Sequence, residues 1–81
     1  MFYVYILRCS DDSLYCGYTN DVEKRFEKHK SGKGAKYTKS HPPLEVVYVE
    51  EFETKSDAMK REFEIKSMTR SQKEKLLRNI G

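Results

Sequence analysis

Apolar residues alternate with other residues along the first part of the chain, as they do in a β-hairpin. Residues 3–9 place their side chains alternately on two faces, and β-branched and aromatic residues dominate this run. The Ser-Asp-Asp-Ser sequence at 10–13 is typical of a turn, and residues 14–18 are typical of a second strand. We therefore predict a hairpin in which Tyr5 and Tyr15 face each other from adjacent strands.

The apolar spacing becomes helical after residue 20. Asn20 can cap a helix, with Glu23 three residues later as its reciprocal partner, and Gly32 stands where such a helix would end. Residues 32–43 hold two Gly and two Pro, which predicts a long loop. Residues 44–52 have the composition of a third strand.

Two more helices are predicted in the last third of the chain. Thr54 and Asp57 have the spacing of a helix cap, and Ser71 and Glu74 repeat it ahead of apolar residues that run to Ile80. The predicted order is β-β-α-β-α-α, which makes this an α+β protein. A chain of 81 residues is expected to form one domain over residues 1–81, without a linker or an internal repeat.

The composition argues against several classes of protein. Hydrophobic residues make up 37% of the chain, and six Tyr and four Phe supply a core, which argues against disorder. The longest apolar run is too short to span a bilayer and lacks the features of a signal peptide. Two Cys without paired spacing make neither a disulfide framework nor a zinc site, so we expect a reducing, cytoplasmic location.

Positive charge is concentrated in one segment. Residues 24–41 contain seven Lys or Arg and one Glu, a net charge of +6, whereas the rest of the chain carries −3. Lysines grouped around a tyrosine indicate binding to phosphate groups, because each Lys can neutralise one phosphate and release counterions. We therefore favour nucleic acid as a partner over a segment that serves only solubility.

Glu62 interrupts the apolar face of the predicted helix that carries it. On a helical wheel of about 100° per residue, Glu62 falls about 40° from Ala58, inside the apolar arc. A carboxylate on a buried face is costly unless it is paired or binds a cation. Two explanations stay open: a metal ligand, or an ion pair with Arg25, Arg61 or Lys66.

Arg25 and His29 are four residues apart on the first predicted helix, so their side chains lie on one face. Arg25 is suited to bidentate contact with phosphate. His29 could equally be a half-buried residue bonded to a neighbour. Gly17, in the interior of a strand, indicates that another group approaches the backbone there.

These residues form an ordered set. The set comprises Tyr3-Val4-Tyr5, Tyr15-Cys16-Gly17, Arg25, His29 and Glu62, and it resembles the motifs of the GIY-YIG nuclease superfamily. The runs Tyr-Val-Tyr-Ile-Leu at 3–7, Lys-Gly-Ala-Lys-Tyr-Thr at 33–38 and Arg-Glu-Phe-Glu-Ile-Lys at 61–66 resemble its small stand-alone members. Two departures are that Tyr3 replaces the first Gly of the family name and that Tyr18 stands where some relatives carry Lys.

The resemblance implies a fold and a set of roles. The fold would be a small three-stranded antiparallel sheet flanked by helices. Glu62 would hold a single Mg²⁺ or Mn²⁺ ion, and Arg25 would contact the scissile phosphate. Tyr15 would act as, or assist, the general base on water, while Tyr5 would orient the nucleophile and His29 would share the proton transfer.

The implied function is metal-dependent hydrolysis of DNA by an endonuclease of DNA repair or processing. We expect the DNA strand to be bound by Lys30, Lys33, Lys36 and Lys39, with Tyr37 stacked on a base. We also expect a monomer without membrane contact that acts on DNA, including single-stranded or branched DNA. The alternative is a non-catalytic nucleic-acid-binding module, or a nuclease subunit that requires a protein partner. The carboxylate of Glu62 favours the enzyme, because a pure binding module does not need it.

Overall fold

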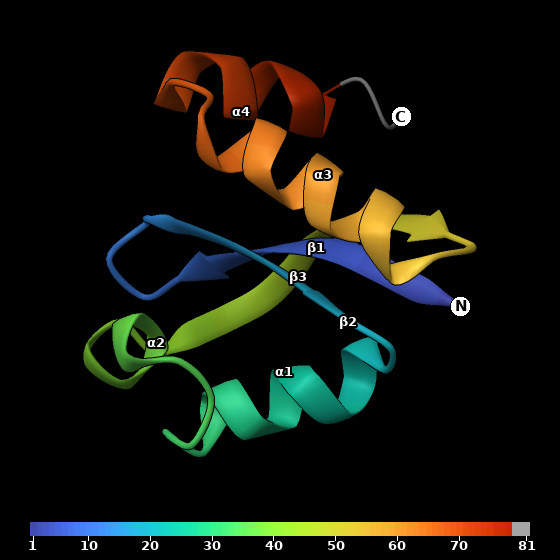
Figure 1. Ribbon diagram of the computed structural model, residues 1–81. Helices are drawn as coiled ribbons and strands as arrows, with labels where there is room; N and C mark the ends of the chain where they lie inside the picture. The colour runs from blue at the N-terminus through green and yellow to red at the C-terminus, as the bar shows by residue number, and fades with distance from the viewer. Residues whose placement is uncertain (79–81) are drawn as a thin grey trace.

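A three-stranded antiparallel sheet lies between two layers of helices (Figure 1). The computed structural model describes residues 1–78. Its elements are the strands β1 (Phe2–Cys9), β2 (Leu14–Thr19) and β3 (Pro43–Phe52) and the helices α1 (Val22–Lys30), α2 (Lys36–Ser40), α3 (Lys55–Lys66) and α4 (Arg70–Arg78). Helices α1 and α2 lie on one side of the sheet, and α3 and α4 lie on the other (Figure 1). The predicted α+β class, with a three-stranded sheet flanked by helices, is confirmed.

Strand β1 is the central strand of a sheet with the order β2-β1-β3. Residues 4–7 are all buried, although their side chains alternate between the two faces, because helices cover both faces. Strand β2 is an edge strand, so side chains from the two helical layers can meet around its free edge. Within residues 1–78, no helix is long and apolar enough to cross a membrane.

Helix α3 is fixed on the sheet by its apolar face and by its N-cap. Ala58 and Ile65 are fully buried in the main core, where they pack with residues of β1. The predicted cap is confirmed, because the Thr54 hydroxyl accepts a hydrogen bond from the backbone N–H of Asp57 at 3.1 Å. These contacts set the rotation of α3 about its axis, and they therefore set the direction of Glu62.

The prediction that Asn20 caps the first helix is wrong by one residue. Asp21 is the N-cap of α1, and its carboxylate accepts a hydrogen bond from the backbone N–H of Lys24 at 3.1 Å. A negative charge also interacts favourably with the positive end of the helix dipole, which favours the Asp over its Asn neighbour. At the other end, Gly32 has a φ of +80° and follows the C-cap Ser31, as predicted.

The last helix also begins at a different cap from the one predicted. Thr69 and Gln72 form the reciprocal pair in place of Ser71 and Glu74. The hydroxyl of Thr69 accepts from the backbone N–H of Gln72 at 3.2 Å, and the Gln72 side chain accepts from the N–H of Thr69 at 2.9 Å. Glutamine serves in this box as well as glutamate does, so the sequence allowed both registers. The predicted apolar position Ile80 lies outside the described residues.

The segment predicted as a continuous loop, residues 32–43, contains the short helix α2. A helix of five residues is not stable in isolation, because nucleation is costly and few hydrogen bonds repay it. Tertiary contacts hold it instead: Thr38 of α2 is 1% exposed and bonds to His29 of α1. The observed order is therefore β-β-α-α-β-α-α.

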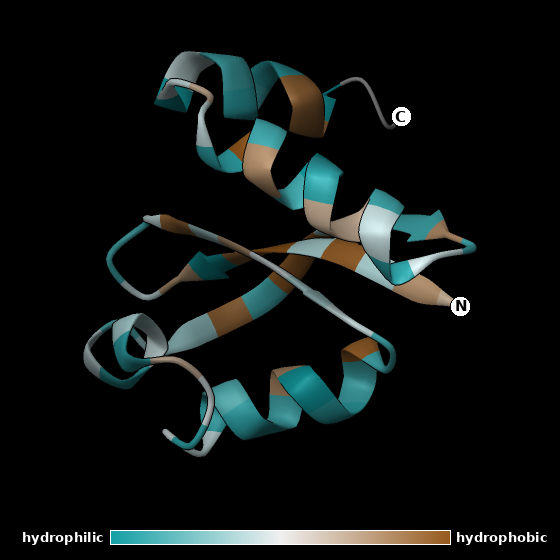
Figure 2. Ribbon diagram, viewed as in Figure 1, coloured by the Kyte–Doolittle hydropathy of each residue, from teal (hydrophilic) through white to brown (hydrophobic). Residues whose placement is uncertain are grey.

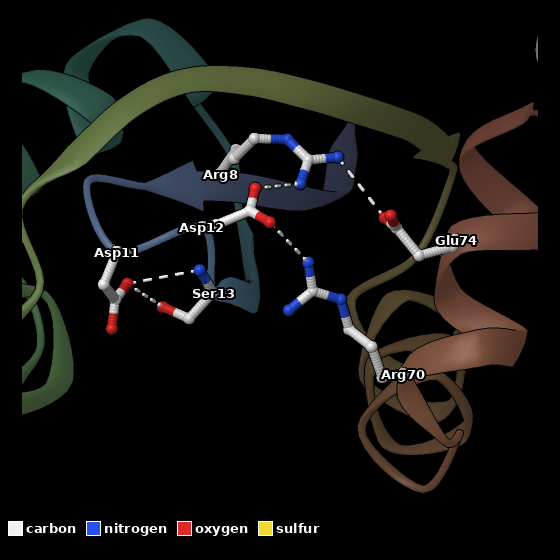
Figure 3. A network of polar contacts seen from close by, with 6 residues as sticks. All are labelled: Arg8, Asp11, Asp12, Ser13, Arg70 and Glu74. Carbon is white, nitrogen blue, oxygen red and sulfur yellow. Dashed lines mark hydrogen bonds and ion pairs between the residues drawn. The ribbon is translucent and has the colours of Figure 1, made fainter.

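A network of charged side chains ties α4 to the hairpin turn (Figure 3). Arg8, near the end of β1, contacts Asp12 at 2.8 Å and Glu74 of α4 at 3.3 Å, and Arg70 contacts the other oxygen of Asp12 at 3.3 Å. Asp11 accepts two hydrogen bonds from the residue two positions later, which closes the turn. Exposed ion pairs contribute only about 0–1 kcal/mol each, so the network mainly orients α4.

Replacing Ile65 by a smaller residue is predicted to destabilise the fold. Ile65→Ala leaves a cavity between α3 and the sheet and should lower the free energy of unfolding by about 2–5 kcal/mol, measured by urea denaturation. Phe63→Ala on the same helix is the control. The Phe63 side chain is 73% exposed, so its removal should change that free energy by less than about 0.5 kcal/mol. Equal effects of the two substitutions would contradict the packing of α3 described above.

Candidate functional site

A cleft of about 370 Å³ opens at the β2 edge of the sheet. Five residues that sequence reasoning singled out line it together, namely Tyr5, Tyr15, Gly17, Arg25 and Glu62. Arg25 comes from α1 on one side of the sheet, and Glu62 comes from α3 on the other. The cleft therefore combines residues of both helical layers, which meet around the edge strand.

The ring of Tyr5 packs against the backbone of Gly17. In the hairpin, Tyr5 pairs with Gly17 and Leu7 pairs with Tyr15. The prediction that the two tyrosines face each other directly is therefore wrong: they are diagonal neighbours whose ring centroids lie 6.5 Å apart. A Cβ atom at position 17 would lie 2.6 Å from the Tyr5 hydroxyl oxygen, so a larger residue there would collide with the ring. The group predicted to approach Gly17 is the Tyr5 phenol.

A chain of buried hydrogen bonds runs from Tyr5 to α2. The hydroxyl of Tyr5 lies 2.9 Å from Nε2 of His29, and Nδ1 of His29 lies 2.7 Å from Oγ1 of Thr38. His29 is fully buried, and Tyr5 is 2% exposed. His29 is thus a helix residue bonded to neighbours, as one reading of the sequence allowed, but it is fully buried and not half-buried. Its contact with the cleft runs through Tyr5.

Burial sets the protonation states of the Tyr5–His29 pair. It raises the pKa of Tyr5 to about 12, an effect that the nearby Arg25 guanidinium opposes. Burial also lowers the pKa of His29, and the positive charge of Arg25 lowers it further. At neutral pH the pair is a neutral phenol beside a neutral imidazole. A neutral imidazole has one ring nitrogen without a proton, so His29 can accept a hydrogen bond.

Tyr15 lies on the partly exposed side of the same group of rings. Its ring meets that of His29 edge-on at a centroid distance of 5.1 Å, and it stacks with Tyr37 of α2 at 5.8 Å. Tyr37 stacks in turn with His41 at 4.2 Å. These contacts hold α2 against β2. They also engage the ring of Tyr37 within the protein, whereas sequence reasoning assigned it to a base of the nucleic acid.

Arg25 brings a fixed positive charge to the cleft. Among residues 1–78, its Nε is the one buried side-chain nitrogen or oxygen atom without a hydrogen-bond partner. An unsatisfied buried donor costs about 1–3 kcal/mol, and more when it is charged. A phosphate oxygen in the cleft would satisfy this donor, because guanidinium groups bind phosphate through paired N–H groups.

Glu62 reaches the cleft with a side chain that is 19% exposed. The sequence allowed an ion pair of Glu62 with Arg25, Arg61 or Lys66. Within the described residues, the pair present is with Lys66, whose Nζ lies 3.6 Å from the Glu62 carboxylate. Arg61 contacts Glu50 instead, at 3.1 Å. The Lys66 side chain is half exposed, so the pair is weak and the carboxylate can also bind a cation.

The basic segment, residues 30–39, adjoins the cleft through α2. Its lysines, Lys30, Lys33, Lys36 and Lys39, reach the solvent. Lys30 lies 3.7 Å from Glu27, whereas the other three form no ion pair within the described part of the chain. In Figure 2, α1 carries the hydrophilic colour over most of its length, and the hydrophobic colour is concentrated in the sheet. Because Lys33, Lys36 and Lys39 are exposed and form no ion pair within residues 1–78, they are available to phosphate groups.

Sequence reasoning did not identify Thr38 and Gly34 as residues of the site. Thr38 bonds to Nδ1 of His29, and a Cβ atom at position 34 would lie 2.3 Å from the same nitrogen. Both contacts arise because the segment after α1 folds back over His29. Both residues belong to the run at 33–38 that resembles the small stand-alone members, but no local pattern shows that this segment returns over His29.

Comparison with known proteins agrees with this arrangement. A family model described as the GIY-YIG catalytic domain matches residues 1–75. The chain belongs to the GIY-YIG family. A UPF0213 protein of Staphylococcus saprophyticus is 56% identical over 75 residues, which cover 93% of this chain and 92% of the relative. A UPF0213 protein of Staphylococcus aureus is 57% identical over 76 residues, with 94% and 93% covered.

Solved structures show the same GIY-YIG fold. The solution NMR structure of the UPF0213 protein BH0048 from Bacillus halodurans is 50% identical, with a TM-score of 0.61 over 95% of this chain and 83% of the other. The solution NMR structure of the protein EF2693 from E. faecalis is 46% identical, with a TM-score of 0.64 over 96% and 83%. Membership of this family implies a nuclease domain, and hence nucleic acid as the partner.

The stability of the GIY-YIG fold is predicted to fall at mildly acidic pH because of His29. The pKa of His29 is lowered in the folded state, whereas in the unfolded chain it is about 6.5. Above that pH both states are neutral and the full stability is present. As the pH falls below about 6.5, the unfolded state takes up the proton first, so the folded state is destabilised.

Urea denaturation at about pH 7.5 and about pH 5.5 tests this linkage. The decrease in stability should be smaller in His29→Gln than in the original protein. The partly exposed His41 provides the control, and His41→Gln should keep the decrease. An unchanged pH dependence in His29→Gln would contradict the neutral state assigned to the buried imidazole.

Proposed function

We propose that this GIY-YIG protein is a metal-dependent DNA endonuclease that hydrolyses phosphodiester bonds in DNA repair or processing. One observation carries the proposal: Tyr5, Tyr15, Arg25 and Glu62 come from four different elements and line one cleft. The basic segment lies beside that cleft, and its lysines can contact phosphates along the rest of the DNA strand. A module that only binds nucleic acid needs the lysines, but it does not need a carboxylate among them.

The donor set of the cleft suits Mg²⁺ or Mn²⁺ bound through Glu62. Within residues 1–78, no three His, Cys, Asp or Glu residues lie together in a way that could hold a metal ion. A single protein carboxylate suits an ion that keeps several waters and binds substrate oxygens, as Mg²⁺ does. When bound, such an ion supplies Lewis acidity at the phosphate.

Arg25 provides the charge stabilisation that hydrolysis requires. Negative charge accumulates on the phosphate oxygens as water attacks phosphorus, and fixed donors aimed at those oxygens stabilise the transition state. The unpartnered Nε of Arg25 is such a donor, and it is already desolvated.

Tyr5, Tyr15 and His29 orient the attacking water and accept or hold its protons. Tyr15, on the more open side of the cleft, assists removal of the proton from the attacking water. Tyr5 orients the water, while its own proton is shared with the neutral imidazole of His29.

The arrangement also favours particular partners. The cleft is open at a sheet edge and small, which suits a single strand or the branch of a DNA junction better than a long duplex. We propose that the protein acts in the cytoplasm as a monomer. A partner protein would extend the limited surface that 81 residues offer for substrate choice.

Removing the carboxylate of Glu62 is predicted to abolish cleavage. Glu62→Ala should lower the rate by at least about 10²–10³-fold while the fold is retained, because the residue that would hold the metal ion is lost. Labelled single-stranded and branched DNA would be incubated with Mg²⁺, Mn²⁺ or EDTA. Glu64→Ala is the matched control, since Glu64 lies on the same helix with a side chain that is 62% exposed, and it should cut normally.

Two other outcomes would contradict the proposal. Full activity of Glu62→Ala would remove Glu62 as the metal ligand. No cleavage by the original protein with either metal, together with salt-sensitive DNA binding by both proteins, would favour the binding module or a subunit that requires a partner.

Reversing the charge of the basic segment is predicted to weaken DNA binding. Changing Lys33, Lys36 and Lys39 together to Glu should raise Kd and reduce the slope of log K against log salt by about 0.7–0.9 for each phosphate that is no longer neutralised. The control carries the same change of charge elsewhere, with Lys60 of α3 and Lys75 and Arg78 of α4, all exposed, changed to Glu. A slope that stays the same in the first variant would exclude the segment from the interface.

A further inference from the structure

Thr38 is a buried polar residue to which the proposed function gives no role. It lies on α2 between Lys36 and Lys39, yet it is 1% exposed. Its hydroxyl oxygen lies 2.7 Å from Nδ1 of His29, 3.2 Å from the backbone nitrogen of Ala35 and 3.0 Å from the backbone oxygen of Ala35. A hydroxyl has one proton to donate and two lone pairs, so three contacts can use its full capacity.

One arrangement of protons satisfies all three contacts. The carbonyl oxygen of Ala35 can only accept, so the Thr38 hydroxyl donates its proton there. The backbone N–H of Ala35 donates to Thr38, and the remaining contact then requires that Nδ1–H of His29 donates to Thr38. The N–H of Ala35 also lies 3.4 Å from Nδ1, but a protonated Nδ1 has no lone pair to accept it, so in this arrangement the N–H bonds to Thr38 alone.

If the Thr38 hydroxyl pointed at His29 instead, its contact with the Ala35 carbonyl would have no hydrogen bond. If the Thr38 hydroxyl donated to Nδ1 instead, its oxygen would lie 3.0 Å from the Ala35 carbonyl oxygen without a proton between them. A neutral imidazole carries one ring proton, so a proton on Nδ1 leaves Nε2 with a free lone pair. That lone pair lies 2.9 Å from the Tyr5 hydroxyl and can accept its hydrogen bond.

We infer that Thr38 is a positioning residue that holds His29 as the Nδ1–H tautomer, with Nε2 directed at the hydroxyl of Tyr5. Gly34 assists, because its missing side chain leaves room for the imidazole, and a Cβ atom there would lie 2.3 Å from Nδ1. The effect on catalysis rests on the proposed function. The tautomer itself does not, since it is a property of the protein without DNA or metal.

Helix α2 would have two roles: it carries lysines that bind phosphate groups, and it orients the His29 imidazole. Its exposed lysines face the solvent, whereas its one buried residue sets the acceptor that Tyr5 needs. Tyr5 donates its hydroxyl proton to Nε2, and Nδ1–H donates to Thr38, so both ring nitrogens are hydrogen-bonded and the ring is fixed. The Tyr5 oxygen keeps its lone pairs for a water in the cleft.

The first test is the protonation pattern of His29 in the protein alone, measured by long-range ¹H–¹⁵N NMR correlations of the imidazole. We expect the original protein at neutral pH to carry the proton on Nδ1 and none on Nε2. Thr38→Val removes the hydroxyl and should shift the ring toward the Nε2–H tautomer, whereas Thr38→Ser should keep the original pattern. Thr69→Val is the control, because that threonine caps α4 on the other side of the sheet from α1, and it should also keep the pattern.

The second test is the kinetics of DNA cleavage with Mg²⁺ or Mn²⁺. Thr38→Val should lower kcat by roughly 10- to 100-fold, as the removal of a partner that orients a functional imidazole does elsewhere, with KM unchanged because Thr38 is buried away from DNA. Thr38→Ser should restore kcat, and Thr69→Val should not alter it.

Several results would overturn the inference. One is a proton on Nε2 in the original protein, and another is an unchanged tautomer in Thr38→Val. A rise in KM at constant kcat would do the same, because it would show a binding role. If Thr38→Val fails to fold, the original protein and Thr38→Ser still decide the tautomer. Absence of cleavage by the original protein would count against the proposed endonuclease and would leave the NMR test intact.

Discussion

The contact between the Tyr5 ring and the bare backbone of Gly17 is the constraint on which the candidate site depends. The β1–β2 register sets these residues opposite each other, and the missing side chain lets the phenol lie across the neighbouring strand. From that position Tyr5 reaches His29 behind it and the cleft in front of it. A shift of register by one residue would turn Tyr5 to the other face of the sheet, and the site would disappear with it.

The edge position of β2 gives the small fold room for a site. A central strand such as β1 is covered on both faces and flanked on both sides, so most of its side chains are buried. Around an edge strand, Arg25 from one helical layer and Glu62 from the other can line the same cleft. The Glu62 side chain stays partly exposed there, which limits its desolvation penalty, whereas the Nε of Arg25 is buried without a partner.

The site separates its groups by environment. Tyr5 and His29 are buried and neutral at physiological pH, because burial disfavours the charged form of each. Arg25 and Glu62 reach the cleft, where water and ligands can compensate their charges. A buried neutral pair keeps its hydrogen bonds in a fixed direction, whereas the charges at the cleft remain available to a phosphate and a cation. This division is what general acid–base chemistry on a charged substrate needs.

The sequence by itself determined the elements with strong local signals and the residue types that carry chemistry. Strand alternation, the Thr54 cap and the glycine after α1 depend on neighbours in the chain, and so does the carboxylate of Glu62 on an apolar arc. Tertiary structure alone decided the diagonal placement of the tyrosines, the existence of α2 and the link between Thr38 and His29. These features join residues that the chain separates, and their free energy comes from burial and from hydrogen bonds that form only when the segment after α1 closes over the imidazole.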